Sequence, residues 1–205
     1  MLTDLRTAPL QMVRQEDGAA IDLAPLQGLW TVEQYLALTD HTRYLVEFAD
    51  GVIEVLPMPT DKHQTILEFL FLALRAFIHP RGGKVLFAAL RMRVRPGKFR
   101  EPDLLLVRDA GDPRRQNRYW LGADLVVEVV SEDDPERDTV EKVADYAEAG
   151  ISEYWIVNPL DETIAVLALA GAAYREHGSF RRGQQASSAL LDGFVVDVDA
   201  VLDAT

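Results

Sequence analysis

Two short runs built almost entirely of Leu and Val, Leu104–Val107 and Leu125–Val130, restrict the fold of this chain more than any other feature. Runs of this kind are typical of strands that are covered on both faces of a sheet. Such strands need helices on either side of them. We therefore predict an α/β (α+β) fold, with a mixed central sheet flanked by helices and with extra β-strands.

Local signals place other elements around these two strands. Helices are predicted at 31–38, 61–78 and 135–149, because each segment follows a residue that can cap a helix start: Thr31, Thr60 or Asp61, and Asp134. Further strands are predicted at 44–48, 52–56, 85–94, 153–157, 163–169, 174–177 and 194–198. Residues 1–28 lack a clear period and are predicted to be an N-terminal extension, followed by a single domain over 29–205.

The third predicted helix has a small apolar stripe with helical spacing. Its members are Val140, Val143, Ala144 and Ala147, at i, i+3, i+4 and i+7, and we expect them to face the core. On a helical wheel, Lys142 lies about 150° from the centre of that stripe. The wheel therefore predicts that Lys142 is a solvated side chain.

Composition excludes several classes of protein. The sequence has no cysteine, which removes disulfides, thiolate nucleophiles and Cys-based zinc sites. Its apolar runs are far shorter than the roughly 20 residues that span a bilayer. Asp4, Arg6 and Arg14 interrupt the N-terminal segment, so no secretory signal is visible. We expect a cytoplasmic protein.

The net charge of −12 argues against a polyanionic partner, but the charge is unevenly distributed. The stretch from Arg75 to Arg118 holds 12 Lys and Arg residues against 4 Asp and Glu residues. This basic island either contacts a polyanion or is an ordinary solvated surface.

One carboxylate, Glu128, stands in the middle of a strand otherwise made of Leu and Val. An unpaired buried carboxylate is costly, so Glu128 must be protonated, paired, bound to a metal, or open to a cleft. A second acid, Asp103, begins the other apolar strand. If the two strands are neighbours, the two carboxylates suit Mg²⁺, which takes one or two protein carboxylates and keeps several waters. Each acid also has a structural explanation: Asp103 can cap its strand, and Glu128 can pair with an Arg.

Three arginines alternate with apolar residues in the predicted strand at 85–94. Arg91, Arg93 and Arg95 would present three guanidinium groups on one face. Such a row suits sequence-independent contacts with nucleic-acid phosphates. It equally suits a solvent-facing strand that uses charge to prevent edge pairing.

A set of separated motifs runs through the middle of the sequence. They are Tyr44–Glu47 with Asp50-Gly51, His63-Gln64, Pro102-Asp103, Val127–Ser131, Arg137-Asp138, Glu141-Lys142, Tyr146–Gly150 and Glu153–Pro159. Together they resemble the Uma2 family of restriction-endonuclease-like proteins, over about residues 30–170.

The resemblance implies a PD-(D/E)xK nuclease core that binds Mg²⁺ or Mn²⁺ and hydrolyses a phosphodiester. Carried over by position, Asp103 and Glu128 are the metal-binding acids. The lysine usually found two residues after the second acid is replaced by Val130, and the resemblance implies that Lys142 on the following helix supplies it. Glu47, His63 and Tyr146 are candidate accessory residues, although an acid in a hairpin strand, such as Glu47, is more often a surface residue and a lone His is more often structural.

Three functions remain open at this level. The first is a Mg²⁺- or Mn²⁺-dependent endonuclease acting on DNA, expected by analogy to be a homodimer. The second is a catalytically inactive nuclease-fold protein that serves as a binding or regulatory module, which the overall acidity favours. A different metal-dependent hydrolase is the third, although His is scarce in this sequence.

Overall fold

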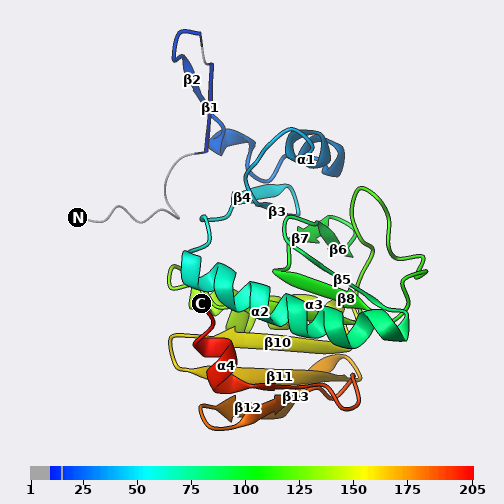
Figure 1. The fold of residues 1–205 in the computed structure, drawn as a ribbon. Coiled ribbons are helices and arrows are strands. Elements are labelled where there is room, and N and C mark those ends of the chain that lie inside the picture. The colour runs from blue at the N-terminus through cyan, green and yellow to red at the C-terminus, as the bar shows by residue number, and fades with distance from the viewer. Residues whose placement is uncertain (1–9, 15) are drawn as a thin grey trace.

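The centre of the molecule is a six-stranded sheet with the strand order β12-β11-β10-β9-β8-β5 (Figure 1). The computed structural model describes residues 10–14 and 16–205, so residues 1–9 and 15 of the predicted extension lie outside the described residues. β9 and β10 are parallel and the other neighbouring pairs are antiparallel. The sheet is therefore mixed, which confirms the predicted fold class. Its strands are β5 Lys84–Phe87, β8 Leu104–Val107, β9 Leu125–Val129, β10 Glu153–Asn158, β11 Thr163–Ala170 and β12 Ala173–Arg181.

Helices cover both faces of this sheet, as the apolar strands require. Helix α2, Asp61–Ile78, packs on the face that contains Val127 and Val129. Helix α3, Lys142–Glu148, packs on the opposite face with Val126 and Val130. Side chains alternate between the two faces of a strand, so Glu128 belongs to the face that α3 covers.

A smaller four-stranded sheet, β4-β3-β7-β6, lies beside the central one (Figure 1). Its strands are β3 Val46–Ala49, β4 Val52–Val55, β6 Met92–Arg95 and β7 Lys98–Arg100. Helix α1, Val32–Thr39, packs on it through Tyr35, which stacks on Phe48 with ring centroids 5.0 Å apart. The predicted capping box is confirmed, since Thr31 and Gln34 satisfy each other's backbone N–H groups.

Two small β-hairpins, a short α-helix and two 3₁₀ helices, Ala24–Leu26 and His79–Arg81, complete the elements of the described residues. The hairpin of β1, Gln11–Val13, and β2, Ala20–Asp22, projects from the body of the molecule (Figure 1). At the other end, β13, Gln185–Ser187, pairs with β14, Val195–Asp197. Helix α4, Val198–Leu202, then packs against the core that contains α2.

The prediction of one strand over 85–94 is wrong. The segment forms two strands that belong to different sheets, because β5 pairs with β8 whereas β6 pairs with β7. The short strand β7 was not predicted. Gly97 sits in the β6–β7 turn with φ of 81°, a conformation that favours glycine.

The predicted orientation of the third helix is also wrong. Val140 is 62% exposed, and the buried side chains here are Asp138, Lys142, Asp145 and Tyr146. A helical wheel assumes that the apolar face points inward, but here each buried cation lies beside buried carboxylates, so a charged face can point inward. In addition, a π-helical turn, Arg137–Glu141, follows the α-helical residues 135–136, and it shifts the phase that a regular wheel assumes.

Within the described residues, no helix has the length and apolar character needed to cross a membrane. The cytoplasmic location stays a prediction.

Candidate metal and catalytic site

The two predicted acids lie side by side at the ends of neighbouring strands. β8 and β9 are antiparallel with Leu104 opposite Val127, so the next pair along the ladder is Asp103 and Glu128. The backbone N–H of Asp103 donates to Glu128 Oε2 at 3.3 Å. The backbone N–H of Val129 donates to Asp103 Oδ2 at 2.8 Å. These reciprocal bonds hold both carboxylates on one side of the sheet.

Lys142 joins this pair from helix α3. Its Nζ lies 3.0 Å from Glu128 Oε1 and 2.9 Å from Asp138 Oδ1, and its side chain is only 5% exposed. The prediction that Lys142 is solvated is therefore wrong. Tyr146, one turn further along α3, donates its hydroxyl to the same Glu128 Oε1.

His63 approaches the site from the first turn of α2. The Thr60 side chain accepts the N–H of His63 and starts the helix there, and His63 Nε2 lies 3.2 Å from Asp103 Oδ2. Burial by itself lowers the pKa of His63, but the hydrogen bond and charge of Asp103 outweigh it and raise the pKa. His63 and Asp103 are each 15% exposed at the side chain, so solvent reaches the site on this side.

We call His63, Asp103, Glu128, Asp138 and Lys142 the acid-rich cluster. It contains three carboxylates and one permanent cation. Burial, together with the charges of Asp103 and Asp138, raises the pKa of Glu128 despite the opposing effect of Lys142. Burial likewise raises the pKa of Asp138. The protein thus gathers three carboxylates here beside Lys142 and His63, and two of the three have raised pKa values.

This donor set fits a hard divalent cation. Asp103 and Glu128 supply carboxylate oxygens, and Mg²⁺ usually takes one or two of these and completes its shell with water or substrate phosphate. No three His, Asp or Glu side chains of the described residues form a ready coordination set. Within that part of the molecule, Asp103 and Glu128 would therefore form a two-carboxylate site with open positions rather than an all-protein cage.

A second buried charge cluster lies next to the first. Arg100 pairs with Glu47, and its Nη2 lies 2.7 Å from Asp145 Oδ2, while Lys98 pairs with the other oxygen of Asp145. We call Glu47, Lys98, Arg100 and Asp145 the balanced cluster, because two carboxylates meet two cations. The charges of Lys142, Arg100 and Arg137 outweigh burial and lower the pKa of Glu47.

The structure therefore brings the candidate accessory residues to different places. His63 and Tyr146 contact the predicted acids directly. Glu47 is 2% exposed, so its expected place on the surface is wrong, and its partner is Arg100.

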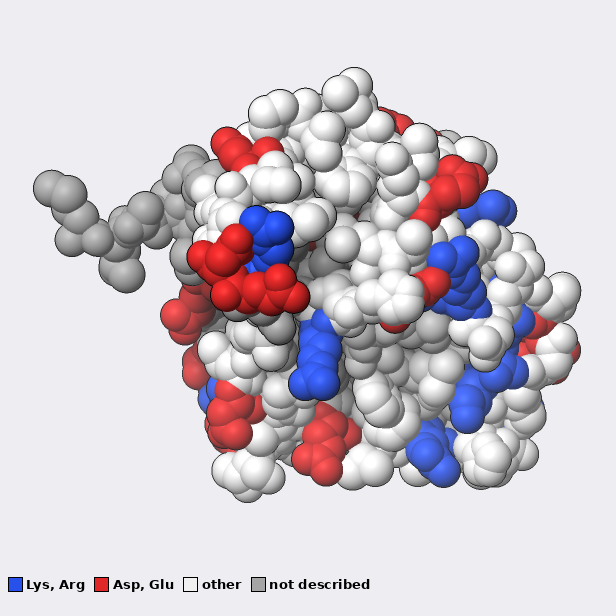
Figure 2. Space-filling view, turned by 90° about the horizontal axis from the view of Figure 1, so that it is seen from above, with Lys and Arg blue, Asp and Glu red and all other residues white. Residues whose placement is uncertain are grey.

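The predicted row of arginines is largely occupied within the protein. Arg91 lies 2.9 Å from Asp40, and Arg95 lies 2.7 Å from Asp50. No ion pair to Arg93 is found within the described residues, and the β6–β7 ladder is irregular between Arg93 and Arg95. On the face that Figure 2 presents, basic and acidic side chains are interspersed. Fewer arginines are thus free to bind phosphate groups than the basic island suggested.

Asp138, Arg100 and Asp145 were missed as members of buried clusters. The signal that could have found two of them is the spacing of Asp138, Lys142 and Asp145, at i, i+4 and i+7. That spacing puts three charged residues on one helix face together with Tyr146.

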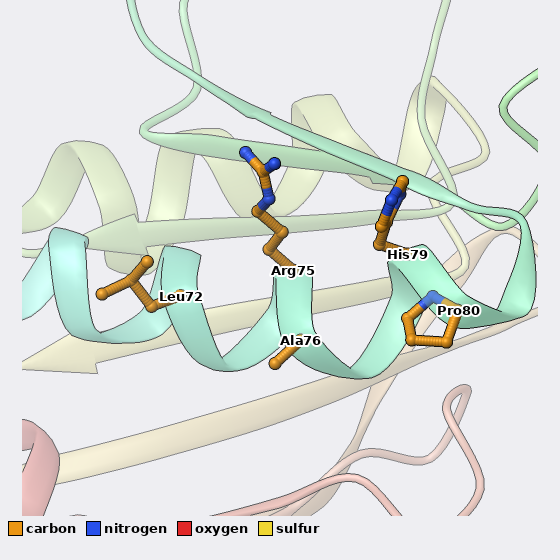
Figure 3. Close-up of a pocket in the computed structure, with 5 residues that line it drawn as sticks. All are labelled: Leu72, Arg75, Ala76, His79 and Pro80. Atoms are coloured by element: carbon orange, nitrogen blue, oxygen red, sulfur yellow. The ribbon is translucent and has the colours of Figure 1, made fainter.

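A separate surface pocket lies along the C-terminal half of α2. It is lined by Leu72, Arg75, Ala76, His79 and Pro80, and Arg75 and His79 point to the same side of the helix (Figure 3). None of the predicted site residues lines it, so this pocket is distinct from the acid-rich cluster.

The sequence matches a known protein family over most of its length. The model of the Uma2 family, described as "Putative restriction endonuclease", matches residues 32–199. Among solved structures, the fold is similar to that of a putative nuclease belonging to DUF820 from Anabaena variabilis ATCC 29413. The TM-score is 0.71 at 18% sequence identity, over 85% of this chain and 98% of that chain. No curated protein matches this sequence. The resemblance drawn from the motifs is confirmed.

Proposed function

Because this chain belongs to the Uma2 family, we propose that it is a Mg²⁺- or Mn²⁺-dependent endonuclease that hydrolyses DNA phosphodiester bonds. The observation that carries the proposal is the convergence of Asp103, Glu128 and Lys142 from three separate elements. A buried excess of carboxylates beside a lysine is otherwise unfavourable. Binding of a divalent cation would relieve that excess.

Each residue has a distinct role in this proposal. Asp103 and Glu128 would hold the cation through carboxylate oxygens. When bound, such an ion supplies Lewis-acid polarisation of a phosphate oxygen and activation of a water. The Lys142 ammonium orients the attacking water and offsets negative charge that develops on the phosphate. His63 holds the Asp103 carboxylate from the solvent side.

The substrate and the assembly are part of the same proposal. Arg93 is the member of the arginine row best placed to contact a phosphate, because Arg91 and Arg95 already pair with aspartates. A homodimer would place two such sites on the two strands of a duplex. Exposed Met12, Val13 and Ile21 on the projecting hairpin are apolar side chains that a second copy would cover. Sedimentation at several protein concentrations tests the dimer.

The alternative is an inactive nuclease-fold protein that binds or regulates. The net charge of −12 and the internal pairing of Arg91 and Arg95 favour it. In that case the acid-rich cluster would bind a cation, or remain partly protonated, without cleavage of a phosphodiester.

Cleavage of supercoiled and linear DNA, with an RNA of matched sequence, separates these functions. We expect nicking or cutting with Mg²⁺ or Mn²⁺ and none with EDTA. Glu128→Gln should lower the rate by about 100-fold or more, and circular dichroism should show that the variant is folded. The matched control is Glu132→Gln, the same change at an exposed position of the following loop, which should cleave like the wild type. Equal background cleavage by the wild type and Glu128→Gln would favour the inactive module.

A further inference from the structure

The immediate surroundings of Lys142 contain a residue that the proposed reaction does not use. Asp138 is 5% exposed, and its Oδ1 lies 2.9 Å from Lys142 Nζ. Glu128 Oε1 lies at a similar distance, 3.0 Å, from the same nitrogen. The ammonium is therefore shared between one carboxylate of the proposed cation site and one carboxylate outside it.

The position of Asp138 is fixed by the sheet as well as by its own helix. Tyr154, on β10, donates its buried hydroxyl to the backbone carbonyl oxygen of Asp138 at 2.8 Å. Tyr154 also packs edge-on against Tyr146, with ring centroids 5.0 Å apart, and Tyr146 donates to Glu128. A closed set of contacts thus runs from Glu128 through the two tyrosines to Asp138, with Lys142 bridging its two carboxylates.

The two oxygens of Glu128 differ in their surroundings. Oε1 accepts the Tyr146 hydroxyl and faces Lys142, whereas the one hydrogen bond to Oε2 from the described residues is the long N–H contact from Asp103 at 3.3 Å. If Asp138 were absent, Lys142 would have Glu128 as its single close carboxylate partner. The ammonium would then compete with a cation for Glu128, and its own position would depend on one contact.

We infer that Asp138 is a positioning residue for Lys142, an inference that rests on the proposed function. It holds the ammonium against Glu128 Oε1 and leaves Oε2 and Asp103 for the cation. The π-helical turn Arg137–Glu141 is the local feature that carries Asp138 into the buried face. The Lys142 N–H bonds to the Arg137 carbonyl across this turn, five residues back. Asp138 itself touches neither substrate nor cation.

Kinetics of single and double variants test this role. Asp138→Asn keeps the shape and removes the charge, and we expect it to lower kcat by about 10- to 100-fold, as loss of a supporting hydrogen-bond partner does at other metal sites. KM and the affinity for Mn²⁺ should change less than about threefold. Asp138→Asn should add nothing to Lys142→Gln, because no ammonium is then left to position. If Asp138 had only a structural role, the reductions in kcat caused by the two substitutions would multiply in the double variant.

The matched control is Asp145→Asn, on the same buried helix face. Asp145 pairs with Lys98 and Arg100, so its effect on kcat should multiply with that of Lys142→Gln. If Asp138→Asn abolishes the heat of Mn²⁺ binding, Asp138 belongs to the cation site and the inference is wrong. Unchanged kcat in Asp138→Asn would contradict it equally.

A measurement without turnover separates this inference from the proposed function. A buried, ion-paired ammonium exchanges its protons slowly, so the ¹⁵Nζ resonance of Lys142, assigned with Lys142→Gln, should be visible by NMR in labelled protein. It should shift or broaden in Asp138→Asn and remain in place in Asp145→Asn. A wild type that does not cleave DNA but shows this pattern would refute the nuclease proposal alone. An unchanged resonance in Asp138→Asn would refute the positioning role alone.

Discussion

Two buried charge clusters lie next to each other in this molecule, and they differ in how many cations pair with their buried carboxylates. In the balanced cluster, Arg100 bridges Glu47 and Asp145, and Lys98 completes the neutralisation. In the acid-rich cluster, Lys142 alone faces Glu128 and Asp138, while Asp103 has only His63 as a cationic partner among the described residues. The carboxylates of the balanced cluster are matched by cations of the protein, whereas the acid-rich cluster has more carboxylates than cations.

The difference separates a cluster with a structural role from a cluster that suits the proposed function. A balanced, well-paired network fixes β3 and β7 of the small sheet against α3, and it requires no further partner. Excess buried carboxylate is unfavourable unless a proton or a cation compensates it. The pKa of Glu128 is accordingly raised, whereas the pKa of Glu47 is lowered. The pKa of a glutamate is thus raised in one cluster and lowered in the adjacent one.

The largest effect should come from breaking the balanced cluster. Arg100→Met removes the shared cation and leaves Glu47 and Asp145 buried with fewer partners. We expect a loss of about 3–5 kcal/mol in the free energy of unfolding, measured by urea denaturation. Lys98→Met is the milder control, because Lys98 is more exposed than Arg100. A loss below about 1 kcal/mol for Arg100→Met would mean that the network contributes little.

The same substitution in both clusters gives the sharpest contrast. Glu47→Gln weakens the pairing of Arg100 and should cost about 2 kcal/mol of unfolding free energy. Glu128→Gln, without divalent cation, loses its pairing with Lys142 but relieves repulsion by Asp103 and Asp138. Its stability should stay within about 1 kcal/mol of the wild type. Equal losses for the two variants in urea denaturation would remove the distinction between the clusters.

The smallest effect concerns the surface. Arg93→Ala should weaken binding to DNA by less than about tenfold and reduce the slope of log affinity against log salt by about one, as expected for one phosphate contact. Arg95→Ala should change the slope less, because Arg95 is already paired with Asp50. Fluorescence anisotropy at several salt concentrations measures both. A larger change in slope for Arg95→Ala than for Arg93→Ala would reverse this assignment.

Much of the fold was predictable because a strand that is buried on both faces of a sheet has an almost entirely apolar sequence. The Leu- and Val-rich strands β8 and β9 were found in this way, and the start of α1 was found from its capping box at Thr31. The split of 85–94 into β5 and β6 was not, because strand pairing depends on tertiary partners rather than on local propensity.

The candidate site was predictable where a residue contradicts its surroundings. Glu128 stands out because it is charged within an apolar strand. Lys142, Asp138 and Asp145 stand out less, because a helix with many charges resembles a solvated one. Their common spacing and, for Lys142, the family resemblance are the signals that single them out. For the same reason, Glu47 was expected at the surface and is buried against Arg100.

The central claim is that the acid-rich cluster is short of positive charge, which a bound divalent cation would supply. Calorimetric titration of the wild type with Mn²⁺ and with Mg²⁺ tests it directly, with Glu128→Gln, Asp103→Asn and Glu47→Gln alongside. We predict saturable binding to the wild type and to Glu47→Gln, and little or none to the other two variants. At about ten times the dissociation constant, bound ion should stabilise the wild type by about 1.4 kcal/mol. Absence of cation binding to the wild type, or equal binding to Glu128→Gln, would contradict the account.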